Sequence, residues 1–149
     1  MSEPAASPVV ELRGTVAVLG GFPVLAGADL TVDRGEIVLL RGPNGAGKTS
    51  LLRLCAGLLP LERGTGRIFG LDLATERLAI RPRVGLLGHH NGLYRDLTVA
   101  QNVEFWGAAV GATDVEVRGA MERLGVHARL ADVPVGRLSA GQKRRTALA

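Results

Sequence analysis

Eight consecutive residues constrain this chain more than any other stretch, and they run Gly42-Pro43-Asn44-Gly45-Ala46-Gly47-Lys48-Thr49. They match the pattern G-x-x-x-x-G-K-[ST], in which glycines let the backbone wrap closely around a phosphate group and point its N–H groups inward. A short apolar run, 37–40, precedes the stretch, and residues of helical character from Ser50 follow it. Strand, loop and helix in that order are the setting that such a loop requires. The sequence therefore predicts a phosphate-binding loop.

Three features of this loop would act on one polyphosphate. Lys48 would reach the β- and γ-phosphates of a nucleoside triphosphate as a point charge, and Thr49 would offer its hydroxyl to Mg²⁺. The helix that begins there would add its positive N-terminal dipole. The expected nucleotide-binding residues are the loop and the residue after it: Gly42, Pro43, Asn44, Gly45, Ala46, Gly47, Lys48, Thr49 and Ser50. An ordinary glycine-rich turn is the alternative, because the chain has 21 glycines to place in turns.

Composition narrows the class of protein further. With 149 residues, of which 46% are hydrophobic, the chain is long enough for one compact domain with a core. Its net charge of +4 comes almost wholly from scattered arginines, and aromatic residues make up only 3%, so we expect no nucleic-acid partner. The longest uncharged run, 14–28, is interrupted by glycines, so we expect no membrane span. No targeting segment is recognisable at the start, and a cytoplasmic protein is expected.

The order of the patterns predicts an α/β chain with a β-rich first part and a helical second part. Capping-box spacings predict helices that begin at Thr98 and Thr113 and end near Gly111 and Gly125, and Ser139 begins one more helix. The apolar run 84–87 is expected to be a second central strand, parallel to 37–40. The expected strands are 9–13, 16–19, 24–32, 37–40, 65–70 and 84–87.

The stretch Leu138-Ser139-Ala140-Gly141-Gln142 turns a general phosphate-loop interpretation into a family interpretation. It resembles the signature motif of ATP-binding cassette (ABC) ATPases. Ser139 can cap the helix, Gly141 permits a close approach to the backbone, and the free N–H groups with the helix dipole make a second anion site. The resemblance implies that Ser139, Gly141 and Gln142 grip the γ-phosphate of ATP bound to a partner subunit. An ordinary Ser-capped helix would explain Ser139 and Gln142 alone.

The resemblance covers residues 9–149 and implies a P-loop NTPase core with an N-terminal antiparallel β part and a helical subdomain. The expected divisions of this partial ABC ATP-binding domain, 1–149, are a nucleotide-binding core with its β part over 9–96, a helical subdomain over 97–138, and the signature motif with the start of its helix over 138–149. The implied ligands are ATP and Mg²⁺, the metal at Thr49. The implied partners are a second ATPase subunit, forming a homodimer, and membrane permease subunits, with the chain peripheral on the inner face of the cell membrane.

Within the family, residues 84–89 together with 97–103 look most like the ATPase subunit of the haem exporter used in cytochrome c maturation. Most ABC ATPases have a Gln that touches Mg²⁺ and the attacking water where this sequence has His89, so the resemblance implies a catalytic position for His89. The usual aromatic that stacks on adenine is missing, because Leu19 falls near its place and Phe22 is only a nearby substitute. Three alternatives remain: the ATPase of a drug or multidrug exporter, a soluble non-transport ABC ATPase, and a small-molecule kinase or GTPase, which the signature motif disfavours.

The family pattern continues past the signature motif through an apolar strand that ends in an Asp for Mg²⁺ and a Glu that serves as base, followed by a switch His. None of these follows Gln142 in this chain. The resemblance therefore predicts that the chain is C-terminally incomplete. On its own it is expected to bind nucleotide weakly and to hydrolyse it hardly at all.

Overall fold

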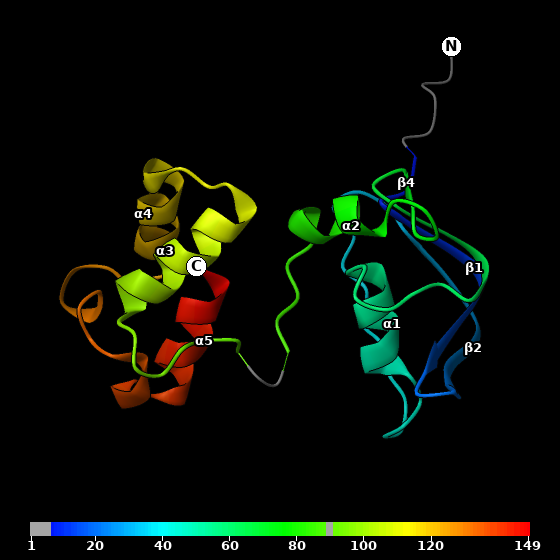
Figure 1. Ribbon diagram of the computed structural model, residues 1–149, viewed down its shortest axis with the longest axis horizontal. Coiled ribbons are helices and arrows are strands. Elements are labelled where there is room, and N and C mark those ends of the chain that lie inside the picture. Colours follow the sequence, from blue (N-terminus) through cyan, green and yellow to red (C-terminus); the bar gives the residue numbers. More distant parts are fainter. Residues whose placement is uncertain (1–6, 89–90) are drawn as a thin grey trace, which may run out of the picture. The chain divides into compact units, whose positions relative to one another are not determined.

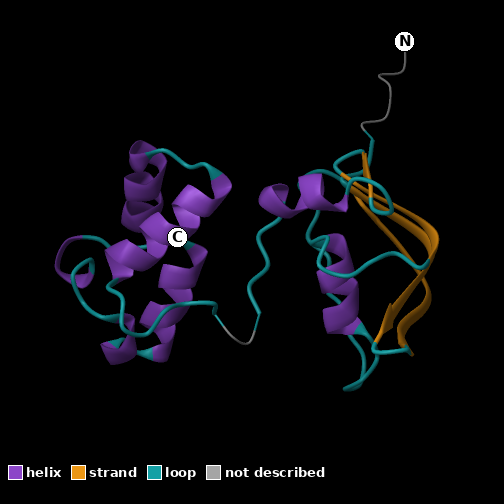
Figure 2. Cartoon of the chain, in the orientation of Figure 1, coloured by secondary structure: helices purple, strands orange, loops and turns teal. Residues whose placement is uncertain are grey.

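The chain falls into two compact units, Met1–Leu86 and Leu87–Ala149, in a computed structural model that describes residues 7–88 and 91–149. All of the strands lie in the first unit, and the described part of the second unit is built from helices and loops (Figure 2). Each unit has a hydrophobic core of its own. No helix in the described ranges combines the length and the apolar character needed to cross a bilayer.

An antiparallel sheet dominates the first unit (Figure 1). Strands β1 (Val10–Leu19) and β2 (Phe22–Val32) form a hairpin, and β3 (Arg63–Ile68) and β4 (Leu71–Asp72) extend it in the order β2-β1-β3-β4. Only Gly20 and Gly21 separate the two hairpin strands, and their φ angles are 58° and 81°. A two-residue hairpin loop favours positive φ at both positions, which glycine adopts without steric cost. Local chemistry therefore explains the hairpin.

The strands predicted over 9–13 and 16–19 are a single strand, so the turn expected at Gly14 is wrong. Gly14 lies inside β1 with φ 54°, and the pairing with β2 shifts register between Leu12 and Thr15. The N–H of Gly14 donates to Asp29 Oδ1 at 2.6 Å, and the buried Thr15 hydroxyl donates to the carbonyl oxygen of Ala28 at 2.7 Å. These two hydrogen bonds hold the irregular position in the sheet. A glycine with positive φ is suited to a bulge as well as to a turn, so the glycine alone did not distinguish the two.

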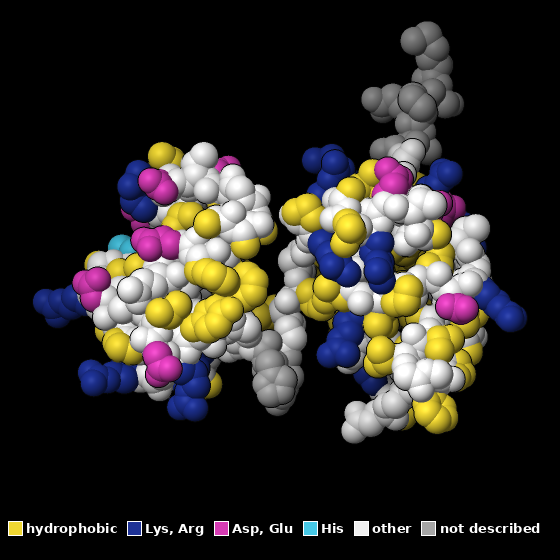
Figure 3. Space-filling model, in the orientation of Figure 1, with side chains coloured by type: hydrophobic (Ala, Val, Ile, Leu, Met, Phe, Trp, Pro, Cys, Tyr) yellow, Lys and Arg dark blue, Asp and Glu magenta, His cyan; other side chains and the backbone are white. Residues whose placement is uncertain are grey.

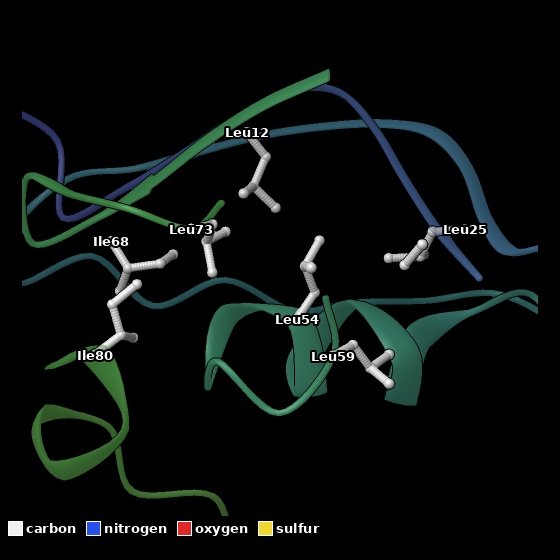
Figure 4. Packing of buried hydrophobic residues seen from close by; sticks show 8 residues of the cluster. Leu12, Leu25, Leu54, Leu59, Ile68, Leu73 and Ile80 are labelled. Atoms are coloured by element: carbon white, nitrogen blue, oxygen red, sulfur yellow. The ribbon is translucent and has the colours of Figure 1, made fainter. Parts of the chain in front are cut away.

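Helix α1 (Lys48–Cys55) covers one face of this sheet. Leu54 of α1 is fully buried and points toward the strands, where Leu12 and Ile68 are buried as well (Figure 4). The short helix α2 (Arg77–Ile80) adds Ile80 to the same core, and the 3-10 turn η1 (Arg81–Arg83) follows it. The sequence patterns predicted neither of these two elements. Each buried leucine or isoleucine contributes about 1.5–3 kcal/mol. The helix that follows the glycine-rich loop is thus fixed to the sheet.

The expected parallel strands 37–40 and 84–87 are not formed, which is a correction to the sequence-based prediction. Neither segment has a strand partner among the described residues, and Ile37 and Leu39 are 95% and 71% exposed. An extended segment becomes a strand only where a neighbour accepts its ladder of hydrogen bonds, and a pair of strands by itself is only marginally stable. The apolar pattern alone does not specify a partner strand, and the described residues provide none for either segment.

The second unit is a small helical assembly. Its helices are α3 (Val99–Val110), α4 (Asp114–Arg123) and α5 (Ala140–Leu148), and the 3-10 turns η2 (Ala128–Leu130) and η3 (Val135–Arg137) lie between α4 and α5. All three predicted helices are confirmed, as are the capping boxes at Thr98 and Thr113 and the left-handed Gly111 that ends α3. Their shared apolar side chains form the core: Val99, Val103, Val117, Met121, Val126, Val135 and Leu138.

A buried asparagine, which the sequence patterns did not single out, ties the start of α3 to the loop before it. Asn102 is fully buried, and its Nδ2 donates to the carbonyl oxygens of Tyr94, Leu97 and Thr98 at 3.0, 3.3 and 2.9 Å. Its Oδ1 accepts the N–H of Tyr94 at 2.8 Å. Because an unsatisfied buried amide is costly, this complete set of partners fixes the loop 94–98 firmly.

Candidate functional site

The glycine-rich loop connects the sheet to α1, and its backbone requires glycine at specific points. Gly42, Gly45 and Gly47 have φ angles of 151°, 86° and 83°, a region that other residues rarely adopt. A Cβ atom on Gly47 would lie 2.9 Å from the carbonyl oxygen of Val24 and 3.1 Å from Leu25 Cδ2. The loop therefore lies directly against β2, and Gly47 is required both by its conformation and by this close approach.

The side chain of Lys48 forms hydrogen bonds with the backbone of its own loop. Its Nζ donates to the carbonyl oxygens of Gly42 at 2.8 Å and Pro43 at 2.7 Å, so the ammonium group lies across the start of the loop. An ammonium group has three N–H donors, and these two bonds use two of them. The third donor and the positive charge remain for an anion.

A cavity of about 430 Å³ opens between the loop, the first turn of α1 and the beginning of β2. Its volume lies within the range of small-molecule sites, which is about 300–1,000 Å³. Six of the nine predicted nucleotide-binding residues line it, namely Asn44, Gly45, Gly47, Lys48, Thr49 and Ser50, together with Pro23 and Val24 of β2. The other three predicted residues, Gly42, Pro43 and Ala46, belong to the loop but are not among those lining residues.

The electrostatic character of the cavity suits an anion. None of its described lining residues is acidic, the first turn of α1 contains no Asp or Glu, and Lys48 supplies a positive charge. The N-terminus of α1 adds its partial positive charge and its free backbone N–H groups. Within the described ranges no cluster of three or more His, Cys, Asp or Glu side chains is placed to hold a metal. A cation at this cavity would therefore need the Thr49 hydroxyl, water and the oxygens of a bound phosphate, a donor set that fits Mg²⁺.

The second predicted anion site lies at the start of α5, in the helical unit. Ser139 and Gln142 form a reciprocal capping box: the Ser139 hydroxyl accepts the Gln142 N–H at 3.3 Å, and Gln142 Oε1 accepts the Ser139 N–H at 2.8 Å. A Cβ atom on Gly141 would meet nothing within 4 Å, and its φ is not in the left-handed region. No contact within the described chain therefore requires glycine at this helical position.

An exposed aromatic cluster on the helical unit was not anticipated from the sequence. We call this cluster the aromatic patch; its members, each about half exposed, are Tyr94, Phe105 and Trp106. The ring centroid of Phe105 lies 5.2 Å from that of Tyr94 and 5.2 Å from that of Trp106, and the ring planes are nearly perpendicular in both pairs. Figure 3 shows hydrophobic side chains gathered on the surface of this unit. The available signal was the adjacent pair Phe105 and Trp106 in a chain with few aromatic residues. His89, the predicted catalytic position, lies outside the described residues.

A G-x-x-x-x-G-K-[ST] loop that leads into a helix packed on a sheet, followed by a helical unit, is typical of P-loop proteins. Comparison with known proteins agrees. The family model described as ABC transporter matches residues 25–149. The chain is 44% identical over 130 residues to the cytochrome c biogenesis ATP-binding export protein CcmA of Ruegeria pomeroyi. The aligned residues cover 87% of this chain and 57% of that protein. The chain therefore belongs to the ABC transporter family.

Solved structures share the fold. The ATP-binding subunit of an ABC transporter superposes with a TM-score of 0.79 at 27% identity, covering 93% of this chain and 59% of that one. A dimeric ATP-binding cassette in a post-hydrolysis state, bound to ADP and Pi, has a TM-score of 0.78 at 24% identity. The match covers 93% of this chain and 67% of that one, and at this identity it establishes a shared fold only. The chain thus spans about three fifths of the length of the first relatives it matches.

Proposed function

We propose that this chain is the ATP-binding part of an ABC transporter that couples ATP binding and hydrolysis to export, with haem for cytochrome c biogenesis as the cargo. The observation that carries the proposal is the cavity at the glycine-rich loop, lined by Lys48 and Thr49, in a chain 44% identical to a cytochrome c biogenesis ATP-binding export protein. Haem is the group that every c-type cytochrome needs, which is why we name it as cargo.

In this proposal the loop holds the triphosphate. The backbone N–H groups of the loop and of the first turn of α1 point at the phosphate oxygens, and Lys48 adds charge through its remaining donor. Thr49 and Ser50 offer hydroxyl groups at the helix start, Thr49 to Mg²⁺, which when bound neutralises charge on the phosphates. The family resemblance assigns His89, which lies outside the described residues, a role beside the attacking water.

The start of α5 is proposed to act on the nucleotide of a second copy. Ser139, Gly141 and Gln142 present a helix N-terminus, and Gly141 leaves that surface free of a side chain although glycine weakens a helix by about 1 kcal/mol relative to alanine. Such a position is explained by an outside group that approaches closely. This supports a homodimer in which each α5 contacts the phosphates held by the other subunit.

The proposed membrane partner is a permease, with the chain on the cytoplasmic face of the membrane. The aromatic patch supports this partner, because adjacent half-exposed aromatic rings are typical of protein contact surfaces. The alternative cargo is a drug, as in multidrug exporters, and the alternative without a permease is a soluble ABC ATPase. The names of the relatives favour cytochrome c biogenesis.

The test is made in the source organism with the chromosomal substitution Lys48→Ala. Haem-peroxidase staining of membrane and periplasmic proteins should show loss of haem-bearing c-type cytochromes while the apoproteins are still made. The control Arg53→Ala removes a positive charge from the same helix, outside the cavity, and should leave the cytochromes unchanged. Normal c-type cytochromes together with altered drug sensitivity in the Lys48→Ala strain would replace haem export by the drug-exporter alternative.

A further inference from the structure

Two of the three asparagines in this chain are followed by glycine, at Asn44-Gly45 and Asn91-Gly92, and the first pair lies in the glycine-rich loop. Glycine has no Cβ, so the backbone nitrogen that follows such an asparagine reaches the side-chain amide carbon with little hindrance. An Asn-Gly pair is therefore the sequence in which an asparagine most readily closes on its own backbone and loses its amide group. The folded structure decides whether the pair is free to do so.

The backbone around Asn44 leaves this pair free to react. The N–H of Ala46 donates to the carbonyl oxygen of Pro43 at 3.3 Å and closes a turn. Asn44 and Gly45 lie at the centre of this turn, where Gly45 has the positive φ, 86°, that glycine favours at the third position. Within the described chain the Gly45 N–H has no backbone partner, and the side-chain hydrogen bonds of the loop are the two that Lys48 donates. Both residues of the pair are exposed to water.

The third asparagine has the opposite environment. Asn102 is fully buried in α3, and its amide forms four hydrogen bonds with the backbone of residues 94–98. An amide held by these partners cannot turn toward the next backbone nitrogen, whose N–H is engaged in the hydrogen-bond ladder of the helix. Asn102 is thus a reference residue that should keep its amide.

The reaction at Asn44 needs only water as a co-reactant. The backbone nitrogen of Gly45 loses its proton to solvent and attacks the side-chain carbonyl carbon of Asn44. The new C–N bond closes a cyclic imide, and the side-chain nitrogen leaves as ammonia. Water then adds to one of the two ring carbonyl groups and breaks its bond to nitrogen. Attack at the side-chain carbonyl gives aspartate, and attack at the backbone carbonyl gives isoaspartate, which has an additional carbon in the main chain.

A carboxylate at position 44 would change the charge of the cavity. Asn44 lines the cavity, where Lys48 is the only charged side chain among the described lining residues, so the product would leave the lining without net charge. The carboxylate would also repel phosphate oxygens. A bound phosphate has the reverse effect on the reaction, because a Gly45 N–H that donates to a phosphate oxygen is held away from the amide of Asn44.

We propose that Asn44-Gly45 is a site of spontaneous deamidation that a bound nucleoside triphosphate protects, and that the reaction irreversibly weakens phosphate binding by an empty loop. The inference rests on the proposed nucleotide site and adds a covalent change that depends on its occupancy. Chains with bound nucleotide keep Asn44, whereas chains that stay empty lose phosphate affinity as they age.

The test follows the three asparagines by peptide mass spectrometry while the folded chain is incubated at mildly alkaline pH. Without ligand, Asn44 should convert to aspartate and isoaspartate, and Asn102 should keep its amide. ATP with Mg²⁺, at about ten times the dissociation constant measured by calorimetry, leaves roughly a tenth of the loops empty and should slow the conversion of Asn44 about tenfold. Adenosine, which has no phosphate, should not slow it. Asn91, which does not line the cavity, should convert at the same rate with and without ATP.

Two variants separate the effect of charge from the reactivity of the amide. Asn44→Asp introduces the product carboxylate directly and should weaken ATP binding by about tenfold or more relative to the neutral Asn44→Gln. Asn44→Gln should show no conversion at position 44, because its longer side chain would have to close a larger ring. Equal ATP affinities of the two folded variants would overturn the loss of phosphate binding.

The remaining results separate this inference from the proposed function. A ligand-free chain that keeps the Asn44 amide, over a period in which the free peptide of residues 42–49 loses it, would overturn the inference and leave the nucleotide site intact. Conversion of Asn44 that is equally fast with and without bound ATP, or slowing by ATP that is equal at Asn44 and Asn91, would overturn protection by the phosphates. A folded chain that binds no ATP would overturn the proposed function itself, and this inference with it.

Discussion

Gly47 and Gly141 each lie at the start of a helix. Contacts and backbone conformation within the chain explain why position 47 requires glycine, but they do not explain the glycine at position 141. Gly47 has φ 83°, and a side chain there would collide with β2. Gly141 lies in α5 with open space around it and a backbone that any residue adopts. The two positions should therefore respond in opposite ways to alanine.

We predict that Gly141→Ala raises the free energy of unfolding of the chain by about 0.5–1 kcal/mol, because alanine favours the helix and loses less backbone entropy on folding. Gly47→Ala should instead lower it by more than about 1 kcal/mol, since the alanine must adopt a left-handed backbone against β2. Urea denaturation followed by circular dichroism measures both. A destabilised Gly141→Ala chain would show that its glycine has a structural role that the described contacts do not explain.

Cys55, the only cysteine, shows how burial controls a single side chain. Burial raises the pKa of its thiol to about 11, and a hydrogen bond to its own backbone only partly opposes this effect. We predict that iodoacetamide alkylates Cys55 at pH 8 roughly 100-fold more slowly than an ordinary thiol, because the thiolate is the reactive form. Mass spectrometry with glutathione as the reference thiol measures the rate. A rate equal to that of glutathione would mean that the side chain is exposed.

At the scale of elements, helix starts were predictable and strand pairing was not. Thr98, Thr113 and Ser139 each form a capping box with the residue three positions later, so the whole signal lies within four residues. The segments 37–40 and 84–87 carry an equally clear apolar pattern, but a strand depends on a partner far away in the sequence. The bulge at Gly14 was missed for a related reason, since only pairing with β2 distinguishes it from a turn.

The capping boxes at Thr98, Thr113 and Ser139 differ in the side chain that accepts the N–H of the capping residue. Gln101 and Gln142 close two of them with amides, whereas Glu116 closes the third with a carboxylate. The N–H and then the hydroxyl of Thr113 donate to this carboxylate and lower the pKa of Glu116. A lowered pKa means that the contribution to stability is present above the unfolded-state pKa and is lost as the pH falls through the folded-state value.

We therefore predict that the start of α4 loosens on acidification while the starts of α3 and α5 do not. The amide resonance of Thr113, followed by NMR from neutral pH downward, should move as Glu116 is protonated, with a midpoint below that of an ordinary glutamate. In Glu116→Gln this movement should disappear, because the amide keeps the same hydrogen bond at every pH. A resonance of Thr113 that shifts equally in both chains would assign the effect to another group.

At the scale of the whole molecule, the family was predictable because both diagnostic motifs are local. Residues 42–49 and 138–142 each specify a loop and a helix start, and the family match over 25–149 confirms the assignment that they suggested. The contribution of β2 to the cavity was not predicted. Pro23 and Val24 carry no motif, and only the folded contact between Gly47 and β2 brings them to the loop.

The central claim is that the cavity at residues 42–50 binds a nucleoside triphosphate through Lys48. Calorimetric titration of ATP with Mg²⁺ into the wild-type chain, Lys48→Ala and the control Arg53→Ala tests it most directly. We predict that Lys48→Ala weakens ATP binding tenfold or more, equivalent to about 1.4 kcal/mol or above. The reason is that Lys48 is the only cationic side chain among the described residues that line the cavity. Arg53→Ala should bind like the wild type, since Arg53 lies on the same helix outside the cavity. A folded Lys48→Ala chain with unchanged ATP affinity would contradict the account.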